Sequence, residues 1–154
     1  MRTLDAVIVE SPLFAGLDQD KLELIAGCGK NVSVAAGERL FREGDAADTF
    51  FLVRHGLAAL ETYVPNRGQS TVATIGPGEI LGWSWLVPPH RWRLSARAVE
   101  DVRAVQFDGE CLRGKCAEDT ALGYELLSRF AGDLADLLTN SYIQLLDVYG
   151  NGSR

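Results

Sequence analysis

Apolar residues in the first thirty positions recur at helical spacing. Leu22 and Ile25 lie about one helical turn apart, and Asp18 precedes them at a position from which its side chain can cap a helix over residues 19–28. We therefore expect short helices across residues 1–30. Their apolar face also includes residues from earlier in the segment: Leu13, Phe14 and Leu17.

Between residues 31 and 107 the pattern changes to short runs rich in β-branched and aromatic residues. Turn signals such as Gly37, Gly44 and Gly56 separate these runs at intervals of mostly about ten residues. Within one run, residues 57–63 alternate between two faces, as in a half-buried strand. This spacing is typical of a compact all-β sandwich or barrel, so we expect a β-roll over residues 31–107.

Helical spacing returns after residue 108. Residues 110–115 are long enough for a short helix, and a run without proline extends from Asp119 or Thr120 to Tyr149. The apolar positions of this run form two adjacent stripes. The first stripe has a 3–4 spacing: Leu127, Phe130, Leu134, Leu137, Ser141 and Val148. The second stripe lies beside it: Leu126, Leu138, Tyr142, Leu145 and Tyr149.

Two stripes on one helix allow two interpretations. One stripe is enough to cover the β-roll, which leaves the other for a partner. We assign the first stripe, which contains Leu127 and Phe130, to a parallel homodimer through this helix. The alternative is a kinked helix whose two stripes form one broad surface facing the core.

The composition is that of a folded domain of ordinary size. The 154 residues are 47% hydrophobic and 23% charged, which excludes a disordered chain. The net charge of −6 argues against nucleic acid as the main partner, because a nucleic-acid binder needs a basic surface that displaces counterions from phosphates. This charge is compatible with a small anionic ligand, since a few arginines can act locally in one pocket.

Membrane, export and metal signals are missing from the sequence. No run approaches the roughly 20 apolar residues that a membrane span requires. Residues 1–10 lack the basic start and long apolar stretch of a secretory signal. The number of cysteines is odd: Cys28, Cys111 and Cys116. They have no further Cys or His partners at the spacing of a zinc site. We therefore expect a cytoplasmic protein with free thiols, no membrane contact and no metal site.

The most specific motif runs from residue 78 to residue 98, G-E-I-L-G-W-S-W-L-V-P-P-H-R-W-R-L-S-A-R-A. It resembles the phosphate-binding cassette of the cyclic nucleotide-binding domains, and Gly37 and residues 43–45 lie where that family places its turns. The resemblance covers about residues 13–149. It implies an α+β, mainly β fold, in which a jelly roll or double-stranded β-helix lies between short N-terminal helices and a long C-terminal helix. It implies a single domain, residues 1–154, with N-terminal helices at 1–30, a β-roll at 31–107, the cassette at 78–98 and C-terminal helices at 108–149.

The resemblance also implies a binding chemistry. In such a cassette a short helix beginning near Gly82 directs backbone N–H groups toward an anion, an arginine contacts the cyclic phosphate, and a glutamate holds the ribose hydroxyl. Here Trp83 replaces that glutamate, and Trp92 occupies the expected arginine position between Arg91 and Arg93. The candidate ligand-binding residues are Gly82, Trp83, Ser84, Trp85, Arg91, Trp92, Arg93 and Ser95.

These departures leave three interpretations of the pocket. Loss of the glutamate removes a charge-assisted hydrogen bond worth roughly 1.5–3 kcal/mol. In the first interpretation, cyclic AMP or cyclic GMP still binds, with Arg91 or Arg93 on the phosphate. In the second, another small anionic or aromatic molecule binds in a box of three tryptophans around an arginine. In the third, Trp83, Trp85 and Trp92 are core residues and the domain is a protein-interaction module.

The remaining chemistry is sparse. The only two histidines, His55 and His90, belong to no nucleophile motif, so we expect no enzymatic activity. The sequence ends soon after the long helix, which leaves no space for the winged helix of DNA-binding family members. We therefore expect a free-standing, dimeric sensor or regulatory subunit. Its long helix would pass a ligand-dependent movement to a protein partner that the sequence does not identify.

Overall fold

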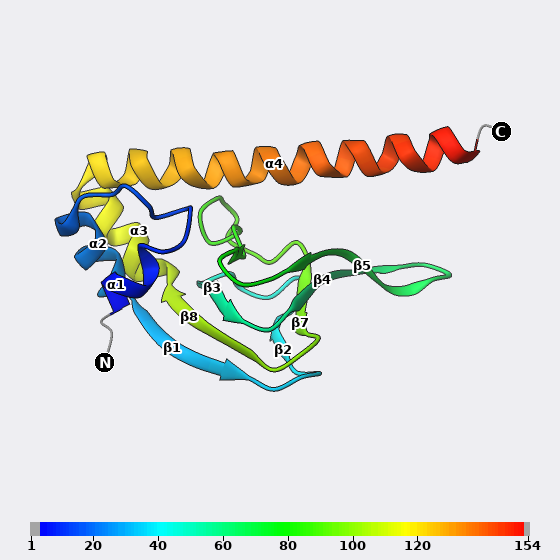
Figure 1. Cartoon of the computed structure of the whole chain (residues 1–154), viewed down its shortest axis with the longest axis horizontal. Helices are drawn as coiled ribbons and strands as arrows, with labels where there is room; N and C mark the ends of the chain where they lie inside the picture. Colours follow the sequence, from blue (N-terminus) through cyan, green and yellow to red (C-terminus); the bar gives the residue numbers. More distant parts are fainter. Residues whose placement is uncertain (1–3, 153–154) are drawn as a thin grey trace.

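The β-roll consists of two four-stranded antiparallel sheets (Figure 1). The computed structural model describes residues 4–152, apart from the side chains of residue 5 and residues 148–152. One sheet has the order β1 (Gly29–Val34), β8 (Val102–Asp108), β3 (Thr49–His55) and β6 (Ile80–Leu81). The other has the order β2 (Arg39–Phe41), β7 (Ser95–Ala98), β4 (Ala58–Val64) and β5 (Gly68–Ile75). The mainly β, jelly-roll fold predicted from the sequence is confirmed.

Helices precede and follow the roll: α1 (Leu4–Ile8), α2 (Gln19–Ala26), α3 (Gly109–Glu118) and α4 (Thr120–Gly152). Acidic residues cap the N-termini of α3 and α4. The Asp108 carboxylate accepts a hydrogen bond from the Cys111 N–H, and the Asp119 carboxylate accepts one from the Leu122 N–H. From α3 onward, α4 runs as one long rod along the side of the roll, past the cassette (Figure 1). Within residues 4–152, no helix is both long and apolar enough to cross a bilayer.

Strand β3 separates two apolar clusters, because successive side chains of a strand point to opposite faces. Phe50 and Leu52 belong to a cluster that includes residues of all four helices, whereas Phe51 and Val53 belong to a cluster built from strands of both sheets. The first cluster anchors α4 to the roll through Phe130, which is buried edge-on against Phe50. The second cluster fills the inside of the roll. The cassette contributes to both clusters, with Trp85 in the first and Leu81 and Trp92 in the second.

The faces of α4 differ from the sequence-based assignment. Phe130 of the predicted dimer stripe is buried in the core, and Leu134 and Leu137 of that stripe lie on the side facing the roll. Ser141 is half-buried, and the side chains of Val148 and Tyr149 lie outside the described residues. The large apolar side chains exposed along the described part of the helix are Tyr124, Leu127, Leu138, Tyr142, Ile143, Leu145 and Leu146. The assignment of the first stripe to a dimer interface is therefore wrong for the buried Phe130 and stays a prediction for Leu134 and Leu137, which line a cavity.

Two cysteines are paired, contrary to the expectation of free thiols. Cys28, in the turn immediately before β1, forms a disulfide with Cys111 in α3, and Cys116 is the one free cysteine of the described chain. The two cysteines are separated by 83 positions in the sequence, which explains why their spacing gives no signal. Disulfides are rare in reducing compartments, so this pairing does not support the predicted cytoplasmic location.

Candidate ligand-binding site

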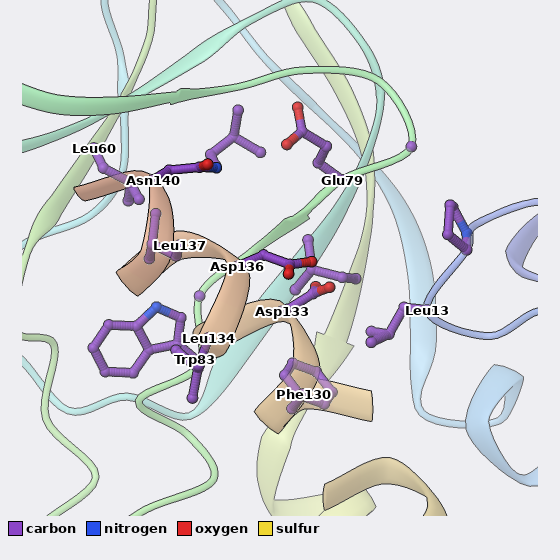
Figure 2. Close-up of a pocket in the computed structure, with 15 residues that line it drawn as sticks. Leu13, Leu60, Glu79, Trp83, Phe130, Asp133, Leu134, Asp136, Leu137 and Asn140 are labelled. Atoms are coloured by element: carbon purple, nitrogen blue, oxygen red, sulfur yellow. The ribbon is translucent and has the colours of Figure 1, made fainter. Parts of the chain in front are cut away.

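A cavity of about 340 Å³ lies between α4 and the β-roll (Figure 2). This volume falls within the range of about 300–1,000 Å³ that is usual for small-molecule sites. The roll and the cassette contribute Leu60, Ile75, Glu79, Ile80, Gly82 and Trp83 to its lining. The facing side of α4 contributes Phe130, Asp133, Leu134, Asp136, Leu137 and Asn140. An occupant would therefore touch the cassette and the long helix together.

The N-terminal loop forms one end of this cavity and is held by polar contacts. The Ser11 hydroxyl donates to the carbonyl of Gly78, the first cassette residue, at 3.2 Å. The Arg129 guanidinium on α4 donates to the carbonyls of Leu13 and Ala15, each at 2.7 Å. Because Leu13 itself lines the cavity, these bonds connect the loop, the cassette and α4 around one space.

The cassette does not form the helix that the resemblance implies. After Gly82 the backbone makes a single turn over residues 84–86, with the Leu86 N–H donating to the Trp83 carbonyl at 3.1 Å. One turn has no aligned set of peptide dipoles comparable with that of a helix terminus. The expected helix beginning near Gly82 is therefore a wrong prediction, and anion binding by the cassette stays a prediction.

Trp92 occupies the interior of the roll at the position where the family pattern places an arginine. Its ring is buried and stacks on Phe41, with centroids 3.6 Å apart and planes 9° from parallel. The space left between Trp92, Trp83 and Leu60 is about 10 Å³, at the lower limit of what one water molecule needs. The region inside the roll is thus filled by protein.

Gly82 is required by this indole. A Cβ atom at Gly82 would lie 2.8 and 2.9 Å from two ring carbons of Trp92, and the φ angle of Gly82 is +102°. The close contact and the positive φ angle each make any residue other than glycine energetically unfavourable at this position. The glycine that the resemblance assigns to close approach of a ligand here permits close approach of Trp92.

The predicted box of three tryptophans is not formed. Trp85 is buried in the core on the other side of β3, where it stacks on Phe50 at 4.7 Å and meets Phe130 edge-on at 5.4 Å. Among the three, only Trp83 is partly exposed and lines the large cavity. The interpretation of the tryptophans as core therefore describes Trp85 and Trp92, while Trp83 is the single aromatic side chain of the cassette available to a ligand.

Neither candidate arginine lines the cavity. Arg91 and Arg93 flank the inward-pointing Trp92 and are both exposed, as alternation along an extended segment requires. Arg91 donates to the carbonyl of Gly44 at 3.0 Å. The expectation that one of these arginines contacts an anion in the pocket is not met in this structure.

The two candidate serines are buried. Ser95, at the start of β7, accepts a hydrogen bond from the Glu43 N–H at 2.9 Å, so its hydroxyl fixes a neighbouring turn. Ser84 lies in the turn after Trp83, beside the small space inside the roll. Neither serine is among the residues that line the large cavity.

The charge of the cavity is negative, which the sequence reasoning missed. Glu79 of the cassette and Asp133 and Asp136 of α4 line it, and its described lining includes no lysine or arginine. Partial burial raises the pKa of the Asp133 carboxyl, and the charges of Asp136 and Glu79 raise it further. One sequence signal for this negative charge was available. Asp133 and Asp136 lie next to Leu134 and Leu137 in the sequence, on the side of the helix that faces the roll in the structure. Among the described residues, no three His, Cys, Asp or Glu side chains meet as a metal site requires.

Asp133→Asn is expected to raise the melting temperature at neutral pH. A pKa above the ordinary value of 3.8 means that the folded protein binds this proton more tightly than the unfolded chain. The stabilisation from the neutral carboxyl is complete below that value and is lost as the pH rises through the raised pKa. The advantage of the variant should therefore disappear at about pH 3–4. Asp147→Asn, on an exposed part of α4 beyond the cavity, is the control. If the melting temperatures of both variants depend on pH in the same way, the raised pKa of Asp133 does not destabilise the folded protein at neutral pH.

The structure thus combines a β-roll with a ligand-sized cavity that the long C-terminal helix lines from one side. The family model of the cyclic nucleotide-binding domain matches residues 31–119. The chain therefore belongs to the cyclic nucleotide-binding domain family, whose members are regulatory binding modules.

Individual relatives agree with this assignment. A solved structure of a Geobacter metallireducens GS-15 protein, assigned to the cyclic nucleotide-binding proteins, superimposes with a TM-score of 0.80 at 31% identity, covering 90% of this chain and 99% of that one. The CRP-like cAMP-activated global transcriptional regulator of Mycobacterium tuberculosis is 22% identical over 88% of this chain and 63% of its own length. The Cyclic AMP receptor protein of Thermus thermophilus is 32% identical over 59% of this chain and 42% of its own length. The chain thus matches less than two thirds of the length of these two curated relatives.

Proposed function

We propose that this domain is a ligand-sensing regulatory module whose binding site is the cavity between the cassette and α4. The observation that carries the proposal is the shared lining: Trp83 and Glu79 of the cassette face Leu134 and Leu137 of the long helix across one space. A ligand in this space contacts both elements. If those contacts are better in one position of α4 than in another, binding shifts the helix between the two positions.

Cyclic nucleotides are the second candidate ligands. The names of the Mycobacterium and Thermus relatives, which refer to cAMP, favour this candidate. The local chemistry opposes it, because Trp92 fills the interior of the roll, Arg91 and Arg93 are outside, and three carboxylates line the cavity. A phosphate in that environment lacks a counterion and meets negative charge. We therefore propose a ligand other than a cyclic nucleotide.

A thermal-shift screen with a metabolite library tests the proposed site. Compounds that bind should raise the melting temperature of the wild-type protein, since a ligand specific for the folded state stabilises it by mass action. The control variant is Leu134→Trp, which fills the cavity from α4 and should abolish the shift; Leu137→Trp provides a second filled variant in case the first folds poorly. Hydrogen exchange of residues 130–140 should slow with the same compounds. If no compound distinguishes the wild type from the filled variants, the proposed function is wrong.

We further propose that α4 forms a homodimer through its exposed stripe. Apolar and small residues continue along one exposed side of the helix at spacings of three and four: Leu127, Ala131, Ala135, Leu138, Tyr142 and Leu145. The two alanines at the centre permit close approach of a second helix, and the larger residues on either side supply apolar area. A second copy presents the same stripe, so a twofold arrangement pairs it with itself.

Replacing both Leu138 and Leu145 by glutamate is expected to give a monomer. Each substitution places a charge in the proposed apolar interface, while both positions are exposed within one chain, so the fold should remain intact. Light scattering at tens of micromolar should give the mass of two chains for the wild type and of one chain for the variant, with similar melting temperatures. A wild-type mass of one chain under these conditions would exclude the dimer.

Other expectations remain predictions. They are the absence of enzymatic activity and of a nucleic-acid partner, the cytoplasmic location, and the protein partner that reads the movement of α4.

A further inference from the structure

We infer that the cavity between α4 and the cassette takes an organic cation with an apolar or aromatic body, such as a small aromatic amine. This inference rests on the proposed function, because it names the class of ligand for the same site. It is carried by three features of the lining: apolar walls, carboxylates without a cationic partner in the lining, and one partly exposed indole.

The walls of the cavity are apolar and come from both sides. Leu60 is buried, and Ile80 and Leu137 are half-buried around it. Transfer of an apolar surface from water into such surroundings contributes about 25 cal/mol per Å² of buried area. The walls therefore select for a molecule with an apolar body, and a simple inorganic ion would leave them uncovered.

The carboxylates supply the charge preference. Figure 2 draws the Asp133 and Asp136 side chains near each other on α4, and Glu79 projects from the cassette. All three are accessible to solvent, so a charged group of a ligand can reach them without full desolvation. Partial burial, followed by repulsion from Asp136 and Glu79, raises the pKa of Asp133; a positive group placed there relieves that repulsion, whereas a negative group adds to it.

Trp83 supplies a surface for a flat or cationic group. Its indole is partly buried and lines the cavity together with Leu134 (Figure 2). An ammonium group within about 6 Å of an indole face is attracted by its quadrupole, and an aromatic ring can stack on the same face. The residue that displaces the family glutamate thereby favours an aromatic amine over a sugar.

A pair of probes with the same body and opposite charge tests the inference. Calorimetry at low ionic strength compares tryptamine, which is cationic, with indole-3-acetate, which is anionic. We expect tryptamine to bind at least about tenfold more tightly and its affinity to fall as salt is added. The double variant D133N/D136N should weaken tryptamine binding by at least about tenfold, whereas D147N, farther along α4, should leave it unchanged.

The outcomes separate this inference from the proposed function. Equal or tighter binding of indole-3-acetate, unchanged tryptamine affinity in D133N/D136N, or no heat with tryptamine at millimolar concentration overturns the inference. If the anion binds and Leu134→Trp abolishes its binding, the cavity remains a ligand site and only the ligand class is wrong. If no probe and no library compound distinguishes the wild type from Leu134→Trp, the proposed function fails as well.

Discussion

Gly82→Ala should destabilise the domain by about 2–6 kcal/mol. A positive φ angle of +102° costs a residue with a Cβ about 1–3 kcal/mol, and overpacking adds a similar amount. The overpacking arises because the new methyl group would lie within 3 Å of the Trp92 ring, and Trp92 is itself held against Phe41. At about 2–4 °C per kcal/mol for a chain of this length, thermal unfolding measures the effect.

Gly78→Ala is the matched control for this substitution. Gly78 also has a positive φ angle, +87°, but no atom lies within 4 Å of the position of a Cβ. The control should therefore lose only the backbone contribution, about 1–3 kcal/mol. Trp92→Phe, which shortens the ring, should cancel part of the loss in Gly82→Ala. Equal melting temperatures for the two alanine variants, or simple additivity with Trp92→Phe, would show that Gly82 does not serve to accommodate Trp92.

Loss of the Cys28–Cys111 disulfide is expected to destabilise the protein by about 2–5 kcal/mol. The bridge closes a loop across 83 positions, and a disulfide stabilises largely by restricting such a loop in the unfolded chain. The double variant Cys28→Ser/Cys111→Ser should therefore melt about 4–20 °C below the wild type. Adding a reductant should lower the melting temperature of the wild type to that of the variant and leave the melting temperature of the variant unchanged.

Thiol titration checks the same pairing without a mutation. The denatured, unreduced chain should expose one reactive thiol, that of Cys116, and the reduced chain should expose all three. Cys116→Ser is the control and should melt close to the wild type, with no reactive thiol before reduction. Three thiols in the unreduced wild-type chain would show that the bridge is absent.

Alternation and turn signals are local, so the sequence was sufficient to predict a β-roll over residues 31–107, and the jelly-roll fold followed from the family resemblance. Two consecutive residues of β3 illustrate this. Phe50 and Phe51 point into different cores, because side chains alternate between the two faces of a strand. The same rule applied to Arg91, Trp92 and Arg93 places the indole opposite the two arginines. In the structure Trp92 is buried and both neighbouring arginines are exposed, as the alternation predicts. The expected contact of one arginine with a ligand in the pocket is therefore not formed.

The site was harder to predict because its parts come together only in three dimensions. Glu79 lies more than fifty positions before Asp133, and nothing in their spacing indicates that they share a cavity. The rotation of α4 was equally undetermined, since its two apolar stripes are adjacent and either can cover the roll. Phe130 settles that rotation through its contacts with Phe50 and Trp85, which are tertiary.

Calorimetric titration with cyclic AMP tests most directly the claim that the ligand site is the acidic cavity and that the phosphate position inside the roll is filled. We expect no saturable heat at millimolar nucleotide in the wild-type protein, because Trp92 occupies that position and neither Arg91 nor Arg93 lines the cavity. Cyclic GMP should behave in the same way. Saturable binding of either nucleotide in the micromolar range, weakened by Arg91→Ala or Arg93→Ala, would contradict this account of the site.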